Sequence, residues 1–396
     1  MGVSLGAIHD SAERYPSPNC HPDTRMAVRQ IILDWIRSES STSFFFWLYG
    51  PAGAGKTAIL QAIAELLCSS LESSQNYGAS FFFSRGKAGR DQGHLLFSTI
   101  TYQLALKVPG LRQHVNRIME LDPTLLTKSM DVQLRTLIVD AFQKLSPLPQ
   151  RPYLVIIDGL DECHDKLAQK SILRLLYETI TVHKLPLRFL IGSRPESHIR
   201  SSFDQESLYT ITHRVDLDET FNPGRDIRVL LQDGFANICA DNSIPSHVKQ
   251  PWPGERIIDL LVQRSLGQFI YAATVLKFVG ADFCNPTEQL ELVLKPDPTA
   301  FSGLDHLYTQ ILSISQQPEN STAATYSYAA YASRQKAEKG NSTPKPSDNV
   351  GGTWMTKAAL LEDELDVDDG STPARRLRRM AIGGNGNGKG KGKEDF

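Results

Sequence analysis

The sequence predicts an α/β fold whose centre is a parallel sheet of five strands, followed by a small all-helical module and a disordered C-terminal tail. Two observations carry this prediction. Short apolar segments rich in β-branched or aromatic residues indicate buried strands, and helical patterns separate them. Strands that alternate with helices form parallel sheets covered on both faces. The predicted strands are 44–49, 78–84, 153–157, 187–192 and 208–212.

The helical patterns divide the rest of the chain. The clearest helix follows Gly55, where one apolar stripe contains Ile59, Ala62, Ile63, Leu66 and Leu67. After Asp216 the strand signals stop and helical periodicity continues. The expected helices there are 227–239, 257–262, 269–279 and one that carries Leu304, Leu307, Tyr308 and Ile311.

From residue 315 the chain is polar, then acidic, then basic, and it ends in a Gly/Asn/Lys tract. Such a composition buries too little apolar surface to offset the entropy of an ordered chain, so we expect disorder. The predicted domains are an N-terminal segment, an α/β domain, a helical domain and the tail, at 1–28, 29–215, 216–314 and 315–396.

Composition excludes several classes of protein. The 42 basic and 44 acidic residues give a net charge of -2, which provides no overall attraction to nucleic acid or to an anionic membrane. The five cysteines are scattered without a CxxC pair, which indicates reduced thiols and no zinc finger. No apolar run has signal-peptide or membrane-spanning length, so we expect a cytoplasmic protein with no membrane contact.

One short basic run, from Arg375 to Arg379, leaves two further interpretations open. It could act as a nuclear-import signal, or it could contact nucleic acid. A solvated tail or an import signal is the simpler interpretation of the same residues. We therefore expect nucleic acid not to be the main partner.

A glycine-rich loop after the first predicted strand carries the strongest chemical signal. It matches GxxxxGK[ST], and it stands between an apolar strand and an amphipathic helix, as this phosphate-binding motif requires. Glycines let backbone N–H groups point into one concavity, and the following helix end adds a positive dipole. The predicted nucleotide-binding residues are Gly50, Pro51, Ala52, Gly53, Ala54, Gly55, Lys56 and Thr57.

A metal ion is expected beside this loop. Lys56 would bridge the β- and γ-phosphates, and the Thr57 hydroxyl would ligate Mg²⁺, which prefers oxygen ligands and keeps several waters. The strand 153–157 ends in Asp158, which we predict to be the second metal anchor. Ligands of open α/β sheets bind at this carboxyl edge of the strands.

Further charged residues lie at the same predicted edge. Asp161 and Glu162 follow Asp158, and either carboxylate could orient an attacking water, because phosphoryl transfer asks mainly for positioning and charge compensation. Arg194 ends the next strand and could sense the γ-phosphate through charge-assisted hydrogen bonds. No NKxD-like motif for reading guanine occurs, so ATP is expected ahead of GTP.

Several segments in this order resemble the NACHT division of the STAND signalling ATPases, in the nephrocystin-like form abundant in fungi. The resemblance covers roughly residues 7–312. Weaker similarities to the same family lie at 192–195, 266–274 and 304–308. The segments that carry it are Cys20-His21-Pro22-Asp23-Thr24-Arg25, the loop 50–57, Phe81-Phe82-Phe83-Ser84-Arg85 and Asp158-Gly159-Leu160-Asp161-Glu162.

The resemblance implies a slow ATPase that cycles between an ADP-bound closed state and an ATP-bound open state. It implies the site roles given above, and it places Arg25 near the adenine. It also implies that the strand 187–192 lies between the P-loop strand and the Asp158 strand. Possible partners would be a second copy of the chain or related NACHT proteins.

The chain departs from the family pattern in two places. Gly267-Gln268-Phe269 stands where members often carry Gly-x-Pro, so nucleotide contact is not expected there. By this resemblance the helical domain 216–314 ends in the start of a winged helix, but after Leu312 the pattern is lost, which predicts that ADP is held weakly. The alternative function is a scaffold or decoy that binds nucleotide, pairs with full-length relatives and hydrolyses nothing.

Overall fold

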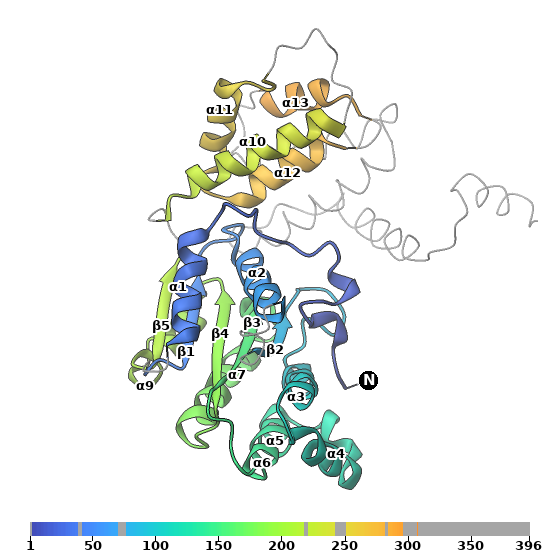
Figure 1. Cartoon of the computed structure of the whole chain (residues 1–396), viewed down its shortest axis with the longest axis vertical. Helices are drawn as coiled ribbons and strands as arrows, with labels where there is room; N and C mark the ends of the chain where they lie inside the picture. Colours follow the sequence, from blue (N-terminus) through green and yellow to red (C-terminus); the bar gives the residue numbers. More distant parts are fainter. Residues whose placement is uncertain are drawn as a thin grey trace, which may run out of the picture. The chain divides into compact units, whose positions relative to one another are not determined.

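Five strands form one parallel sheet in the order β2-β3-β4-β1-β5 (Figure 1). The computed structural model describes residues 2–38, 42–69, 77–217, 221–241, 251–281, 284–295 and 307. All four strand pairs are parallel, which confirms the predicted fold class. The strands are β1 (Phe45–Tyr49), β2 (Tyr77–Phe82), β3 (Tyr153–Asp158), β4 (Leu187–Ser193) and β5 (Thr212–Asp216).

The strand order confirms one prediction and corrects another. β4 pairs with both β1 and β3, so it lies between the P-loop strand and the strand of Asp158, as expected. The predicted strand 208–212 is wrong: its first residues belong to the short helix α9 (Glu206–Tyr209), and the strand begins at Thr212. β5 is an edge strand with mostly polar, partly exposed residues, so it has no apolar run that would indicate a strand.

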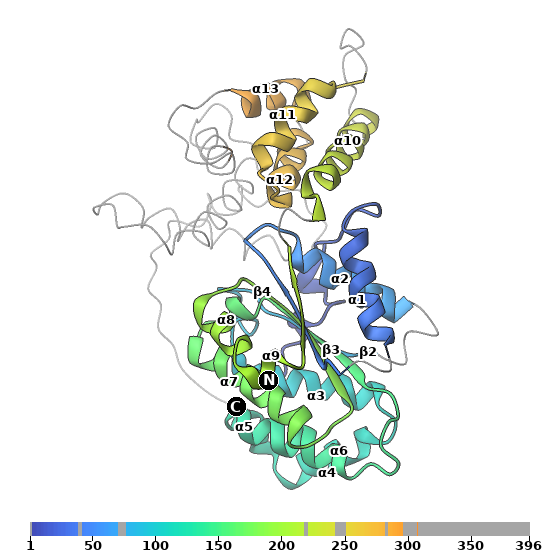
Figure 2. The same ribbon diagram turned by 90° about the vertical axis from the view of Figure 1, so that its left-hand side faces the viewer.

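Side-chain alternation along the strands separates two cores. Phe45 and Trp47 point to one face of the sheet, while Phe46 and Leu48 point to the other. The second face packs against α1 (Met26–Arg37) and α2 (Lys56–Ser69). The face with Phe45 and Trp47 packs against a larger group of helices, and Figure 2 shows α7 and α8 on the side opposite α1 and α2. That group includes α3 (Leu96–Lys107), α7 (Lys166–Thr181) and α8 (Ser197–Phe203).

The long connection between β2 and β3 is mainly helical. After α3 come α4 (Leu111–Leu121), α5 (Met130–Gln133) and α6 (Asp140–Gln143), with a π-helical stretch at Leu134–Val139. Buried Leu134, Ile138 and Phe142 recur every four residues and place this connection in the first core.

A helical module follows the sheet. It contains α10 (Pro223–Asp241), α11 (Glu255–Ser265), α12 (Phe269–Val279) and α13 (Pro286–Leu294), so the three helices predicted at 227–239, 257–262 and 269–279 are confirmed. Ile227, Leu231 and Phe235 are buried at helical spacing along α10. The predicted helix around Leu304 and the predicted tail lie outside the described residues, apart from the buried Leu307.

The N-terminal residues 2–15 pack onto the edge of the sheet at β2. The backbone N–H of His9 donates to Ser80 Oγ (3.0 Å), and Gln61 Nε2 on α2 donates to the His9 carbonyl (2.9 Å). The backbone N–H of Ser4 donates to Thr99 Oγ1 (2.9 Å). These hydrogen bonds join residues 2–15 to β2, α2 and α3 of the α/β domain.

No helix among the residues that the structure describes is long and apolar enough to cross a membrane.

Candidate nucleotide-binding site

The glycine-rich loop connects β1 to α2 at the carboxyl edge of the sheet. Gly53 (φ 75°) and Gly55 (φ 92°) both adopt the left-handed region, where a Cβ atom costs free energy. A Cβ atom added at Gly55 would meet nothing within 4 Å, so its backbone angle alone explains the glycine. The structure places this loop, as predicted, between an apolar strand and a helix N-terminus.

Lys56 turns back over the loop. Its Nζ donates to the carbonyl oxygens of Gly50 and Pro51, both at 2.8 Å. Burial lowers the pKa of Lys56, and the charges of Asp161 and Asp158 oppose that shift. The ammonium group therefore lies in the concavity where the motif places phosphate oxygens, held by acceptors that an anion can replace.

Asp158 ends β3 as a buried carboxylate, 2% exposed. Burial raises its pKa to about 6, opposed by a hydrogen bond from Thr57 and by the charges of Lys56 and Arg14. Its Oδ1 has no hydrogen-bond partner. An unpartnered buried oxygen beside a threonine hydroxyl suits a hard cation such as Mg²⁺.

The described residues contain no group of three or more His, Cys, Asp or Glu side chains that could hold a metal alone. The Thr57 hydroxyl is hydrogen-bonded to Asp158, so a cation at Asp158 would have Thr57 as a second protein ligand and would take its remaining ligands from phosphate and water. Mg²⁺ is usually bound in this manner, through one or two carboxylates plus substrate phosphates.

Gly192 on β4 makes room for the Asp158 carboxylate. A Cβ at position 192 would lie 2.6 Å from Asp158 Oδ1 and 2.5 Å from Leu60 Cδ1. We expect Gly192→Ala to destabilise the protein by roughly 1–3 kcal/mol, because the added methyl overpacks this contact. Urea unfolding measures the change. Gly224→Ala is the matched control, since its nearest contact would be an ordinary 3.6 Å from Val262 Cγ1; equal stability of Gly192→Ala and wild type would contradict the prediction.

The two candidate catalytic carboxylates, Asp161 and Glu162, have different surroundings in the structure. Asp161 is buried and faces Arg194: its Oδ1 accepts from the Arg194 backbone N–H (2.9 Å), and its Oδ2 lies 3.3 Å from Arg194 Nε. Glu162 is only partly buried, and its Oε2 accepts from the backbone N–H of Arg85 (3.2 Å). Asp161 is thus engaged in holding Arg194, while Glu162 is the less enclosed acid.

Two residues that were not among the predicted site residues fix the turn after β3. Gln169 on α7 donates from Nε2 to the Cys163 carbonyl (2.7 Å), and its Oε1 is hydrogen-bonded to His198. Arg85 donates from Nη2 to the Asp161 carbonyl (2.9 Å). Only the three-dimensional fold brings them to the turn, because they lie on separate elements.

Arg25 lies against the P-loop, 3% exposed. Its Nη2 donates to the Ala54 carbonyl (2.9 Å), its backbone N–H donates to Asp226 Oδ2 (2.8 Å), and its guanidinium lies 4.7 Å from the ring centre of Phe269. Nε and Nη1 have no partner. Arg25 therefore joins the loop to α10 and α12 and retains donors for a further group.

The first turn of α12 also reaches the loop. The Ile270 backbone N–H donates to the Gly53 carbonyl (3.4 Å), and a Cβ at Gly53 would lie 2.4 Å from Ile270 Cγ2. Close approach of α12 is therefore a second reason for glycine at position 53. The sequence Gly267-Gln268-Phe269 thus allows contact with the P-loop, although it lacks the proline of the resembled pattern.

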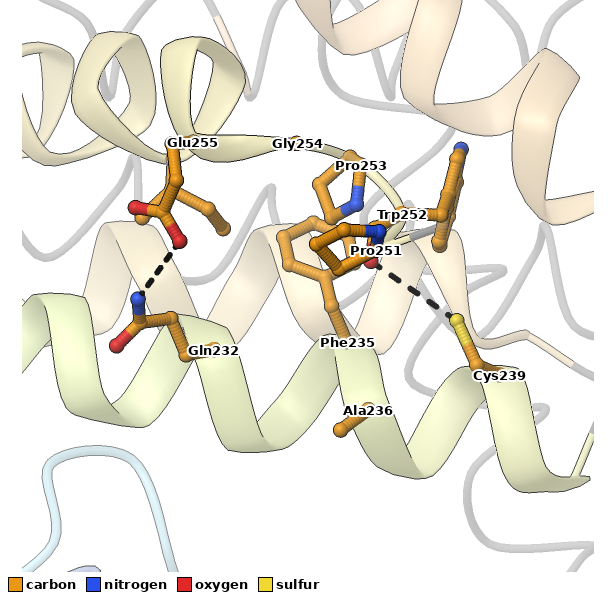
Figure 3. Close-up of a pocket in the computed structure, with 10 residues that line it drawn as sticks. Gln232, Phe235, Ala236, Cys239, Pro251, Trp252, Pro253, Gly254 and Glu255 are labelled. Carbon is orange, nitrogen blue, oxygen red and sulfur yellow. Dashed lines mark hydrogen bonds between the residues drawn. The ribbon is translucent and has the colours of Figure 1, made fainter. Parts of the chain in front are cut away.

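A separate cavity of about 370 Å³ lies in the helical module (Figure 3). Phe235 and Trp252 meet edge to face at one side of it, and Cys239 Sγ lies 3.9 Å from the Trp252 carbonyl. Gln232 and Glu255 form a hydrogen bond at its rim. None of its lining residues belongs to the P-loop or to the turn after β3, so it is distinct from the candidate nucleotide site.

A known family matches the central part of the chain. Residues 27–194 match the family model described as Nephrocystin 3, N-terminal. The match runs from α1 to Arg194 and includes the P-loop and Asp158. The sequence matched none of the curated proteins with which it was compared.

Two solved structures are similar to this chain. The replication initiator DnaA bound to AMPPCP and single-stranded DNA has a TM-score of 0.35 at 10% identity, covering 86% of this chain and 92% of that chain. AMPPCP-bound DnaA from Aquifex aeolicus has a TM-score of 0.31 at 10% identity, covering 85% and 91% respectively.

Proposed function

We propose that this protein is a nucleotide-dependent switch that binds Mg-ATP at the loop 50–57 and hydrolyses it slowly. The observation that carries the proposal is the arrangement at one edge of the sheet. Lys56 lies over the loop, and the buried Asp158 has an oxygen without a partner beside Thr57. Together they offer a phosphate cradle and a cation ligand.

The protein residues divide the work as follows. Backbone N–H groups of the loop and Lys56 bind the phosphates, and Thr57 and Asp158 would hold Mg²⁺. When bound, Mg²⁺ would compensate the charge of the phosphates. Arg25, with two unpartnered nitrogens beside the loop, is proposed to face the adenine.

We assign the water-orienting role to Glu162 rather than to Asp161. Asp161 is buried and already accepts from Arg194, so its role in this proposal is to hold Arg194 in place as the γ-phosphate sensor. Glu162 lies next to it and has a backbone donor to orient it. A phosphoryl transfer needs such a group mainly to position the attacking water.

The contacts of Arg25 and Ile270 offer a way to transmit the nucleotide state. Both connect the loop 50–57 directly to the helical module, through Asp226, Phe269 and Gly53. A loop that changes shape on binding phosphate would therefore move the first turn of α12. These contacts support our proposal that this chain is a switch, as the NACHT proteins that its sequence resembles are.

Steady-state ATP turnover tests the proposal. We expect wild type to release phosphate slowly in Mg²⁺, and we expect Glu162→Gln to lower the rate by about 10²–10⁴-fold while ATP still binds, as for loss of a general base. Asp161→Asn should also lower the rate, but it should in addition loosen Arg194. Mg-ATP binding without turnover in wild type would favour the non-hydrolysing scaffold instead.

A further inference from the structure

Arg14 is a buried cation outside the segment that matches the family model. It lies in a 3-10 turn, Ala12–Arg14, and is 6% exposed. Its guanidinium carbon lies 3.5 Å from the ring centre of Phe82, and its Nη1 is buried without a hydrogen-bond partner. A buried charge with an unsatisfied donor is costly unless a charge of opposite sign lies nearby.

The sheet register places Arg14 on the same face as Asp158. Phe82 on β2 is the register partner of Asp158 on β3, and partners in a parallel pair point to the same side. Phe82 belongs to the core under α2, as do Leu154 and Ile156, whose alternation Asp158 continues. Asp158 Oδ1 lies close to Gly192 on β4, and Arg14 lies on Phe82 of β2, the strand on the other side of β3.

The charges around Arg14 single out Asp158 as its main compensation. Burial lowers the pKa of Arg14 to about 10, and Asp158 is the largest charge that opposes the shift; Arg90 adds to the shift, whereas Tyr77 and Glu65 oppose it. Arg14 remains protonated at neutral pH, and Asp158 is the largest negative charge that offsets the cost of its burial.

We infer that Arg14 is the resident counter-cation of Asp158, that it sets the affinity of the site for Mg²⁺, and that Mg²⁺ binding in turn weakens the docking of residues 2–15. This inference rests on the proposed function. Mg²⁺ at Asp158 cancels the negative charge that compensates Arg14. The buried guanidinium then lies near a cation that repels it. Coupling between two sites is reciprocal, so the same factor must appear in Mg²⁺ affinity and in segment docking.

The first measurement is the Mg²⁺ concentration required at saturating ATP. We expect Arg14→Gln to need about three- to tenfold less Mg²⁺ than wild type, because a like charge near the cation has been removed. Arg14→Lys keeps the charge and should behave like wild type. Arg117→Gln removes one exposed charge on α4 and is the matched control for net charge.

The second measurement is hydrogen exchange of residues 2–15 in the wild-type chain, with ATP and EDTA compared with ATP and Mg²⁺. The amides of Ser4 and His9 are bonded to Thr99 and Ser80, so they report docking. We expect Mg²⁺ to speed their exchange by about the same three- to tenfold factor. This arm needs no variant and decides the inference even if Arg14→Gln does not fold.

The outcomes separate this inference from the proposed function. A wild-type chain that binds no ATP, or binds it equally well without Mg²⁺, contradicts the proposed function. If Mg²⁺-dependent binding is present, an unchanged or raised Mg²⁺ requirement in folded Arg14→Gln overturns the inference alone. Slower or unchanged exchange of Ser4 and His9 with Mg²⁺ overturns it as well.

Discussion

Lys56→Ala should weaken Mg-ATP binding by about 100-fold or more. In the structure the Lys56 ammonium is held over the loop by two carbonyl oxygens, so a bound phosphate would exchange these acceptors for charged ones. A hydrogen bond to a charged group contributes roughly 1.5–3 kcal/mol, and Lys56 would make at least one of them. Isothermal titration calorimetry with Mg-ATP measures the loss.

The matched control for Lys56→Ala is Lys170→Ala, which removes an exposed lysine on α7. It should bind Mg-ATP like wild type. We also expect Lys56→Ala to fold at least as stably as wild type, because burial already lowers the pKa of Lys56 and so disfavours its charged form. If Lys56→Ala retained wild-type affinity, the loop would not be the phosphate site.

Asp158→Asn should stabilise the protein in the absence of nucleotide at neutral pH. The pKa of Asp158 is raised from 3.8 to about 6 by burial, so between these pH values the folded chain binds more protons than the unfolded chain. Stability is therefore lost as pH rises through this window and stays low above it. A pKa raised from 3.8 to about 6 corresponds to roughly 3 kcal/mol less free energy of unfolding above this window.

Urea unfolding of both proteins between pH 4 and pH 7.5 checks this prediction. As pH rises from 4 to 6, the free energy of unfolding of Asp158→Asn should increase relative to that of wild type by up to roughly 3 kcal/mol. Above pH 6 this difference should level off. Asp131→Asn, an exposed aspartate on α5, should show no such gain. A variant less stable than wild type at pH 7.5 would contradict the account of Asp158 as an acid whose burial costs more free energy than Thr57, Lys56 and Arg14 offset.

The motif residues could be predicted from sequence because their chemistry is local. The P-loop lies in one contiguous segment with its flanking strand and helix, and Asp158 ends the apolar strand β3. The residue types within each of these segments are enough to predict its local structure. The position of β4 between β1 and β3 was also predicted, but through resemblance to a family rather than from periodicity.

Other features depend on contacts between distant segments. The predicted strand 208–212 misses most of β5 because an edge strand needs no apolar run; in β5 His213 is exposed, Val215 is buried and the other three residues are partly buried. The pairing of Asp161 with Arg194 connects two strand ends that only the sheet brings together. Arg14 had no sequence signal, since a single arginine in a polar segment gives no indication that it will be buried on Phe82.

The central claim is that Mg-ATP binds at the loop 50–57 with Asp158, and a thermal melt of the purified chain tests it most directly. With Mg-ATP at a hundred times its dissociation constant, wild type should gain about 2.7 kcal/mol of stability, and its melting midpoint should rise. EDTA should reduce the shift, and Lys56→Ala should abolish it. An unshifted midpoint in wild type, or an equal shift in Lys56→Ala, would contradict the claim.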